Sequence, residues 1–258
     1  MTDDRVVRLL ARDKLANVMP LKMTDHHGDS IETTYLKDER SEGALIVLPI
    51  GAFPYDRRTY EAFDQVVIPV ATSAAILTQL LDAVPSGRTI FKLSSPDDYE
   101  TVNQRFDLVR LRAFLSYCDE LPPRRLTTED PLVEITQQLD DRLVPLFEMN
   151  DYARPELERL FSHGAASFAV FEGKSPVSVG LTFQNYDEVW EIGALRTVQS
   201  ALRQGLSTKI VNAALGYLGH RSRRARYGVA DSNRPSQRLA ERCGLKHFLT
   251  VTHYSSHT

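Results

Sequence analysis

The hydrophobic period changes several times along the second half of the chain, and this succession is the strongest constraint on its fold. Apolar residues recur at helical spacing in residues 140–161, and an interruption at 150–155 predicts two helices with a bend. Strict alternation in residues 176–183 is typical of a strand with one buried face. An amphipathic helix is then predicted from Leu206 to Leu218.

Shorter signals complete this half. Further strands are expected at residues 132–136, 168–171, 189–198, 227–230 and 248–254, and a further helix at 235–243. Gly244 is a typical residue to end that helix. The order is strand, two helices, three antiparallel strands, helix, strand, helix, strand, which predicts a mixed α/β domain.

A stretch rich in proline and charge divides the chain. Residues 120–131 read ELPPRRLTTEDP, with three prolines and five charges and no apolar period. We therefore expect domains at 1–120 and 132–258, joined by a linker at 121–131. The first half repeats a similar order more faintly, with helices at 4–19, 73–81 and 96–106 and strands at 31–36, 44–50, 66–71, 89–93 and 108–117. This smaller α/β domain could reflect either duplication or structural mimicry.

Composition excludes several classes of protein. With 42% apolar and 25% charged residues the chain is expected to pack as a globular protein. A net charge of −3 argues against nucleic-acid binding. The longest apolar stretches, at 44–50 and 66–71, are far shorter than the ~18–20 residues of a membrane span. The acidic start and two cysteines in apolar contexts favour a cytoplasmic protein.

The junction of strand 189–198 with the next helix has features of a phosphate site. Residues 195–209 read LRTVQSALRQGLSTK, so that Gly205 and two hydroxyl residues open the helix. Exposed N–H groups at a helix N-terminus bind phosphate, and Arg203 could add a charged contact. An ordinary capped helix is the alternative.

Two blocks resemble a known family. The junction resembles motif A of the GCN5-related N-acetyltransferases (GNAT), Q/R-x-x-G-x-G/A. It departs from the motif at Leu202, where Gln or Arg is usual, and at Ser207, where the second Gly or Ala is usual. Residues 229–245, VADSNRPSQRLAERCGL, resemble the family signature V-x-x-x-N-x-x-S-x-x-L-Y-x-x-x-G-F. The element order of residues 132–254 is also similar. The resemblance covers the C-terminal half and implies a GNAT fold with acetyl-CoA as co-substrate.

The resemblance also implies residue roles. The strand would separate from its neighbour and pair with the pantetheine arm, the amides of the loop would hold the pyrophosphate, and the start of the next helix would border the cofactor. The implied cofactor-binding residues are Leu195, Arg196, Thr197, Val198, Arg203, Gln204, Gly205, Leu206, Ser207, Thr208, Asn233 and Ser236. No metal site is expected, because residues 25–29 (DHHGD) lack regular ligand spacing.

Glu191 is the candidate general base. It precedes Gly205 by 14 residues (205 − 191), similar to the base in histone-acetylating members, and a carboxylate can accept a proton from an amine. A solvent-facing strand glutamate is the alternative. The family's usual general acid is a tyrosine that protonates the leaving thiolate, and Ala240 occupies its position in this chain. Tyr254 or water could protonate the thiolate instead, or the enzyme could be slow.

We therefore predict an N-acetyltransferase that transfers the acetyl group to a small-molecule amine by direct attack in a ternary complex. An acyl-CoA-binding regulatory protein is the alternative, and protein acetylation is a weaker one. The bend at residues 147–155 is expected to shape acceptor choice, and a monomer is favoured over a homodimer. The cluster Arg221, Arg223, Arg224 and Arg226 is expected to be a solvated turn.

Overall fold

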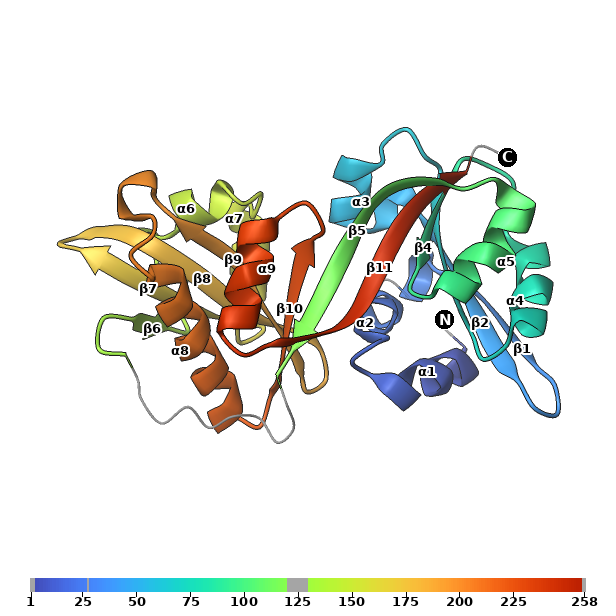
Figure 1. The fold of residues 1–258 in the computed structure, drawn as a ribbon, viewed down its shortest axis with the longest axis horizontal. Helices are drawn as coiled ribbons and strands as arrows, with labels where there is room; N and C mark the ends of the chain where they lie inside the picture. The colour runs from blue at the N-terminus through green and yellow to red at the C-terminus, as the bar shows by residue number, and fades with distance from the viewer. Residues whose placement is uncertain (1–2, 27, 120–129, 257–258) are drawn as a thin grey trace. The chain divides into compact units, whose positions relative to one another are not determined.

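A computed structural model describes residues 3–26, 28–119 and 130–256 (Figure 1). The chain divides into two compact units: unit 1 is Met1–Phe114 with Leu249–Thr258, and unit 2 is Leu115–Phe248. This differs from the expected domains 1–120 and 132–258, because the last strand of the chain pairs with a strand of unit 1 from Thr252 to Ser256. Residues 121–129 of the expected linker, 121–131, lie outside the described residues.

Unit 1 is an α/β unit with strand order β1-β2-β3-β4-β11-β5. Helices α4 and α5 pack on one face of its sheet through residues such as Ile76, Val102 and Phe91. Its elements are α1 (Asp4–Leu10), η1 (Ala11–Asp13), α2 (Val18–His26), η2 (Gly28–Ser30), β1 (Glu32–Lys37), β2 (Glu42–Pro49), η3 (Ile50–Ala52), α3 (Pro54–Thr59), β3 (Gln65–Ala71), α4 (Ala74–Leu80), η4 (Leu81–Ala83), β4 (Thr89–Leu93), α5 (Pro96–Phe106) and parts of β5 (Val109–Cys118) and β11 (Lys246–Ser256).

One expected helix of unit 1 is two helices in the structure. The helix predicted over residues 4–19 stops at Leu10 and resumes at Val18. Asp13 accepts a hydrogen bond from the Ala16 amide, and the Asn17 side chain donates to the Leu10 carbonyl. Such local side-chain bonds give the backbone an alternative to the helix.

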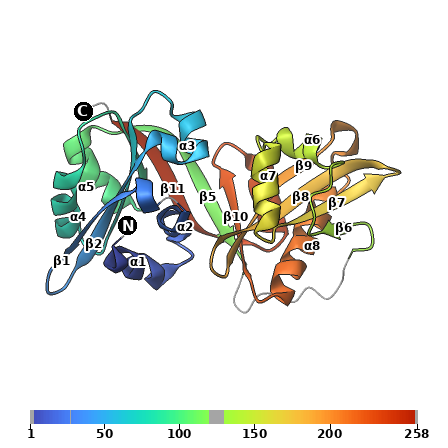
Figure 2. The same cartoon turned by 180° about the vertical axis from the view of Figure 1, so that it is seen from behind.

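Unit 2 has strand order β5-β10-β9-β8-β7-β6. Helices α8 and α9 cover one face of its sheet, and α6 and α7 cover the other (Figures 1 and 2). Its elements, besides parts of β5 and β11, are β6 (Glu134–Thr136), α6 (Val144–Glu148), α7 (Arg154–Ser162), β7 (Ala166–Glu172), β8 (Ser175–Tyr186), β9 (Val189–Thr197), η5 (Gln199–Ala201), α8 (Leu206–His220), β10 (Arg224–Ala230) and α9 (Arg234–Arg242).

Strand β8 is buried on both faces, whereas its alternating sequence predicts one buried face. The expected polar face, Ser178, Gly180 and Thr182, lies under α8. A Cβ at Gly180 would come within 2.5 Å of the Ile210 side chain, so the glycine allows the helix to approach the sheet. Small residues on this face therefore indicate close helix packing rather than solvent.

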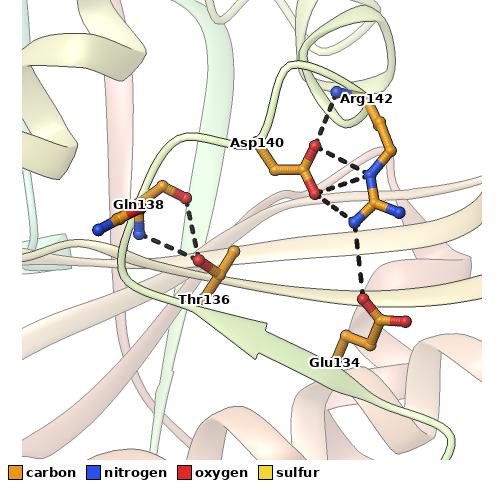
Figure 3. A network of polar contacts seen from close by, with 5 residues as sticks. All are labelled: Glu134, Thr136, Gln138, Asp140 and Arg142. Atoms are coloured by element: carbon orange, nitrogen blue, oxygen red, sulfur yellow. Dashed lines mark hydrogen bonds and ion pairs between the residues drawn. The ribbon is translucent and has the colours of Figure 1, made fainter.

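An exposed network joins β6 to the segment before α6 (Figure 3). The Arg142 guanidinium donates to both Asp140 oxygens and lies 3.6 Å from Glu134 Oε2. Its side chain is half exposed, so these ion pairs contribute little to stability.

Among the helices that the structure describes, none is long and apolar enough to cross a membrane.

Candidate active site

Strands β9 and β10 form a fork. They pair in parallel only from Val189 to Glu191 and from Arg224 to Arg226, although β9 continues to Thr197 and β10 to Ala230. Beyond the fork, β9 pairs on its other side with β8. The edge of β9 that holds Leu195, Arg196 and Thr197 is therefore unpaired with β10 and offers main-chain groups to a ligand.

A bulge lies on β9 directly after the fork. Ala194 has a φ of 52°, and the register with β8 shifts between Val179 and Leu181. The carbonyl of Leu195 accepts a hydrogen bond of 3.2 Å from the Asn150 side chain, which lies in the α6–α7 bend. Bulges change the direction of the backbone, and the Asn150 side chain holds this one in place. Asn150 lies in the bend at residues 147–155, which was expected to shape the choice of acceptor.

The β9–α8 loop ends in two left-handed residues. Arg203 has a φ of 63° and Gly205 a φ of 77°, and α8 begins immediately afterwards. A Cβ at Gly205 would meet nothing within 4 Å, so space is open above it. The Thr208 amide donates to the Gly205 carbonyl, which leaves the amides before it to face a ligand. Arg203 and Gln204 are exposed.

Ser207 turns its side chain toward the sheet. Its hydroxyl lies 2.9 Å from Thr197 Oγ1, which in turn lies 2.8 Å from Ser178 Oγ. This chain of hydroxyls ties the first turn of α8 to β9 and β8. The serine that replaces the second Gly or Ala of motif A therefore leaves the helix N-terminus open.

The start of α9 is held by its own side chains. Asn233 caps the helix by accepting from the Ser236 amide, and the Ser236 hydroxyl lies 2.6 Å from the Tyr227 hydroxyl. Burial raises the pKa of Tyr227 to about 12. Ala240, at the position of the family tyrosine, is fully buried.

Glu191 is buried, so the alternative of a solvent-facing strand residue is wrong. Only 8% of it is exposed. Its Oε2 accepts from Arg226 Nη1 at 2.5 Å and from Asn185 Nδ2 at 2.6 Å, and its Oε1 accepts from the Gly228 amide at 2.7 Å. The carboxylate thus bonds to the β10 main chain just past the point where the two strands stop pairing.

The basic cluster is also not a single solvated turn. Arg226 lies within β10, 8% exposed, and its Nη2 donates to Ser116 of β5. Arg221 stacks on Tyr217 at the far end of α8 from the loop. Sequence reasoning missed Arg226, although a charge inside an apolar strand is a signal of a buried pair.

Residues 132–245 match the model of the acetyltransferase (GNAT) family. Residues 132–245 form a GNAT domain. The fold is similar to a GNAT acetyltransferase from Colwellia psychrerythraea, with 12% identity, TM-score 0.60, and coverage of 99% of this chain and 98% of that one. It is likewise similar to a tandem GNAT protein of clavulanic acid biosynthesis, with 11% identity, TM-score 0.58, and coverage of 99% of this chain and 96% of that one. A Drosophila protein is similar as well, with 11% identity, TM-score 0.63, and coverage of 99% of this chain and 97% of that one.

No curated protein sequence matches the chain significantly. Identities of 11–12% show a shared fold and nothing finer. The expected mixed α/β sheet with a C-terminal GNAT domain is confirmed. The alignment with the tandem GNAT protein extends over 99% of the chain, so unit 1 also lies within the shared fold.

Proposed function

We propose that the GNAT domain catalyses acetyl transfer from acetyl-CoA to the amine of a small molecule. One observation carries the proposal: an unpaired edge of β9 runs from the fork to a helix N-terminus opened by left-handed Gly205. Acyl transfer from an acyl-CoA is the reaction class of GNAT enzymes. The acetyl donor, the amine acceptor and the ternary complex are our inference.

The residues of this region fit the cofactor. The main chain of residues 195–198 would pair with the amides of the pantetheine arm, and the amides of residues 203–207 would hold the pyrophosphate. Thr208 supports this turn through its bond to Gly205 rather than binding directly. Asn233 and Ser236 border the far side, where they hold the first turn of α9. The open space at Gly205 and the inward hydroxyl of Ser207 leave room for the phosphates.

Acetyl-CoA supplies a thioester whose carbonyl carbon the amine attacks. At neutral pH the amine must first lose a proton. Oε1 of Glu191 accepts one hydrogen bond and keeps a second lone pair, so it can take that proton directly or through a water. Main-chain amides at the bulge near Leu195 would stabilise the charge that develops on the carbonyl oxygen.

Water is the proton donor that we propose for the departing thiolate. A free thiol has a pKa of ~8.5, so it leaves without a strong acid. The pKa of Tyr227 near 12 makes that phenol a poor donor at neutral pH. Tyr254 belongs to unit 1, where it packs against Tyr99.

The second candidate is an acyl-CoA-binding regulatory protein. Two features favour it. Ala240 stands in place of the family tyrosine, and the Glu191 carboxylate already accepts hydrogen bonds from three donors. Titration calorimetry with acetyl-CoA, followed by assays of thiol release over a panel of small amines, separates the two. Binding with release supports the enzyme, binding without release supports the regulator, and absence of binding overturns both.

A further inference from the structure

The Arg226 guanidinium has two fixed arms. Nη1 lies 2.5 Å from Glu191 Oε2 and Nη2 lies 2.8 Å from Ser116 Oγ, and Ser116 is fully buried. A guanidinium is planar, so fixing two nitrogens fixes its plane. Arg226 is thus anchored on β5 while it holds a carboxylate on β9.

Glu191 in turn has little freedom. Arg226 and Asn185 occupy Oε2, which forces Oε1 toward the Gly228 amide at the fork. The neighbouring register partner, Phe183, is apolar. The Tyr152 hydroxyl lies near Gly193 on the same face of β9, and Tyr227 lies on the opposite face of β10.

We propose that Arg226 is a positioning residue that holds the Glu191 carboxylate in place and directs its Oε1 to the fork. This inference rests on the proposed function, in which Glu191 accepts the proton of the amine. Arg226 acts through Glu191 and touches neither substrate. Without the guanidinium, Oε2 keeps only the Asn185 donor, so Oε1 is no longer held toward the fork.

Four variants of the full-length chain test the proposal. Arg226→Met removes both arms, Arg226→Lys keeps the charge with one point of contact, and Ser116→Ala releases the anchor but keeps the ion pair. Arg142→Met removes an exposed arginine and is the matched control. For each we would measure the acetyl-CoA dissociation constant and, separately, kcat and KM for an amine.

We expect Arg226→Met to bind acetyl-CoA within about twofold of wild type but to lose about 10²-fold in kcat, the cost of a misplaced catalytic group. The KM for the amine should stay within about twofold of wild type, because the variant misplaces the proton acceptor and leaves the binding of the amine unchanged. Arg226→Lys should restore part of kcat. Ser116→Ala should lower kcat less than Arg226→Met does, because the ion pair with Glu191 remains.

The proposal is overturned if the kcat of Arg226→Met equals that of wild type, if the Lys variant is no better than the Met variant, or if the KM for the amine rises as much as kcat falls. If Arg226→Met does not fold, Ser116→Ala decides: a lower kcat at unchanged KM supports the proposal, and a wild-type kcat overturns it. A wild-type chain that binds acetyl-CoA but acetylates no amine overturns the proposed function itself. That outcome is separate from an active wild type whose Arg226 variants behave normally.

Discussion

At the scale of single residues, the site depends on where side chains point more than on which letters match a motif. Ser207 departs from motif A, yet its hydroxyl faces Thr197 and leaves the helix start open. The spacing to Gly205 makes Glu191 a candidate base, but it does not indicate the donors on the carboxylate. Arg226 and Gly228 are 35 and 37 residues away, on β10, and Asn185 is on β8. Nothing in a local pattern indicates that Arg226 meets Ser116 110 residues away.

Gly205 offers a matched test of the pyrophosphate assignment. Asn and Asp both tolerate the left-handed region, and the space around Gly205 is open, so Gly205→Asn and Gly205→Asp should fold alike. Only Asp places a negative charge beside the phosphates. We expect Gly205→Asp to weaken acetyl-CoA binding at least about tenfold more than Gly205→Asn, by calorimetry. Equal affinities would contradict the assignment.

Glu191→Gln tests the proton acceptor. The amide cannot take the proton of the amine, so the acetylation rate should fall by roughly 10²–10⁴ at pH 7. The loss should shrink at high pH, where more amine is already unprotonated. The acetyl-CoA dissociation constant is the control and should stay near that of wild type. A variant with wild-type rates at pH 7 would show that Glu191 has only a structural role.

At the scale of elements, hydrophobic period predicts helices and strands well but says little about what covers them. The strand expected at 89–93 and the helix at 96–106 occur as β4 and α5. Strand β8 was expected to have a solvent face, and α8 covers it, because serine, glycine and threonine are read as polar although they are also small. The hydrophobic period indicates which residues share a face, and only tertiary packing decides whether that face is exposed to solvent.

Gly180→Ala tests the close contact between α8 and β8. The added methyl would lie 2.5 Å from Ile210 Cγ2 and 2.7 Å from Leu195 Cδ2. We expect the free energy of unfolding to fall by about 1–3 kcal/mol in urea titrations. Gly51→Ala is the control, since no atom lies within 4 Å of its Cβ position. Equal losses in the two variants would contradict the packing argument.

The lowered pKa of His253, on β11, predicts how the stability of unit 1 changes at acid pH. His253 lies 2.5 Å from the Tyr60 hydroxyl, and burial, helped by the charges of Lys92 and Arg112, lowers the pKa of His253 to about 2. The unfolded chain takes up this proton below a pH of ~6.5, whereas the folded chain does not. Stability should therefore fall as the pH drops from ~6.5 toward 2, by up to about 1.4 kcal/mol per pH unit.

His253→Asn can still accept from Tyr60 but does not titrate. Its free energy of unfolding, measured in urea between pH 6.5 and 4.5, should vary less with pH than that of wild type. The wild-type chain at pH 8 provides the reference, because His253 is neutral there in both states. An unchanged slope in the variant would exclude His253 as its source.

At the scale of the whole molecule, one cofactor per chain is expected. The junction in unit 1 that corresponds to the β9–α8 loop is short: Ser73 directly caps α4 by accepting from the Ile76 amide, with no glycine turn. Calorimetry should give one acetyl-CoA per full-length chain. A fragment of residues 115–248 should retain that site if it folds, since it keeps Ser116 and the fork. Two sites per chain would refute this.

Division of the chain was the least predictable feature. The prolines of residues 120–131 were interpreted as a boundary, but strands β5 and β11 each contribute residues to both units. A local composition signal cannot reveal that Thr252–Ser256 pairs with β4, some 160 residues earlier. Such pairing is a property of the assembled sheet and has no sequence motif of its own.

The position of β11 fixes an order of events during synthesis. Unit 1 begins first, yet its sheet lacks the strand from Leu249 to Ser256 until all of unit 2 has left the ribosome. Until then β4 has an open edge on the side that β11 will occupy, and open edges invite pairing with other chains. Unit 2 is complete before unit 1. A chain that ends at residue 248 would therefore contain the whole GNAT domain beside an incomplete, aggregation-prone sheet in unit 1.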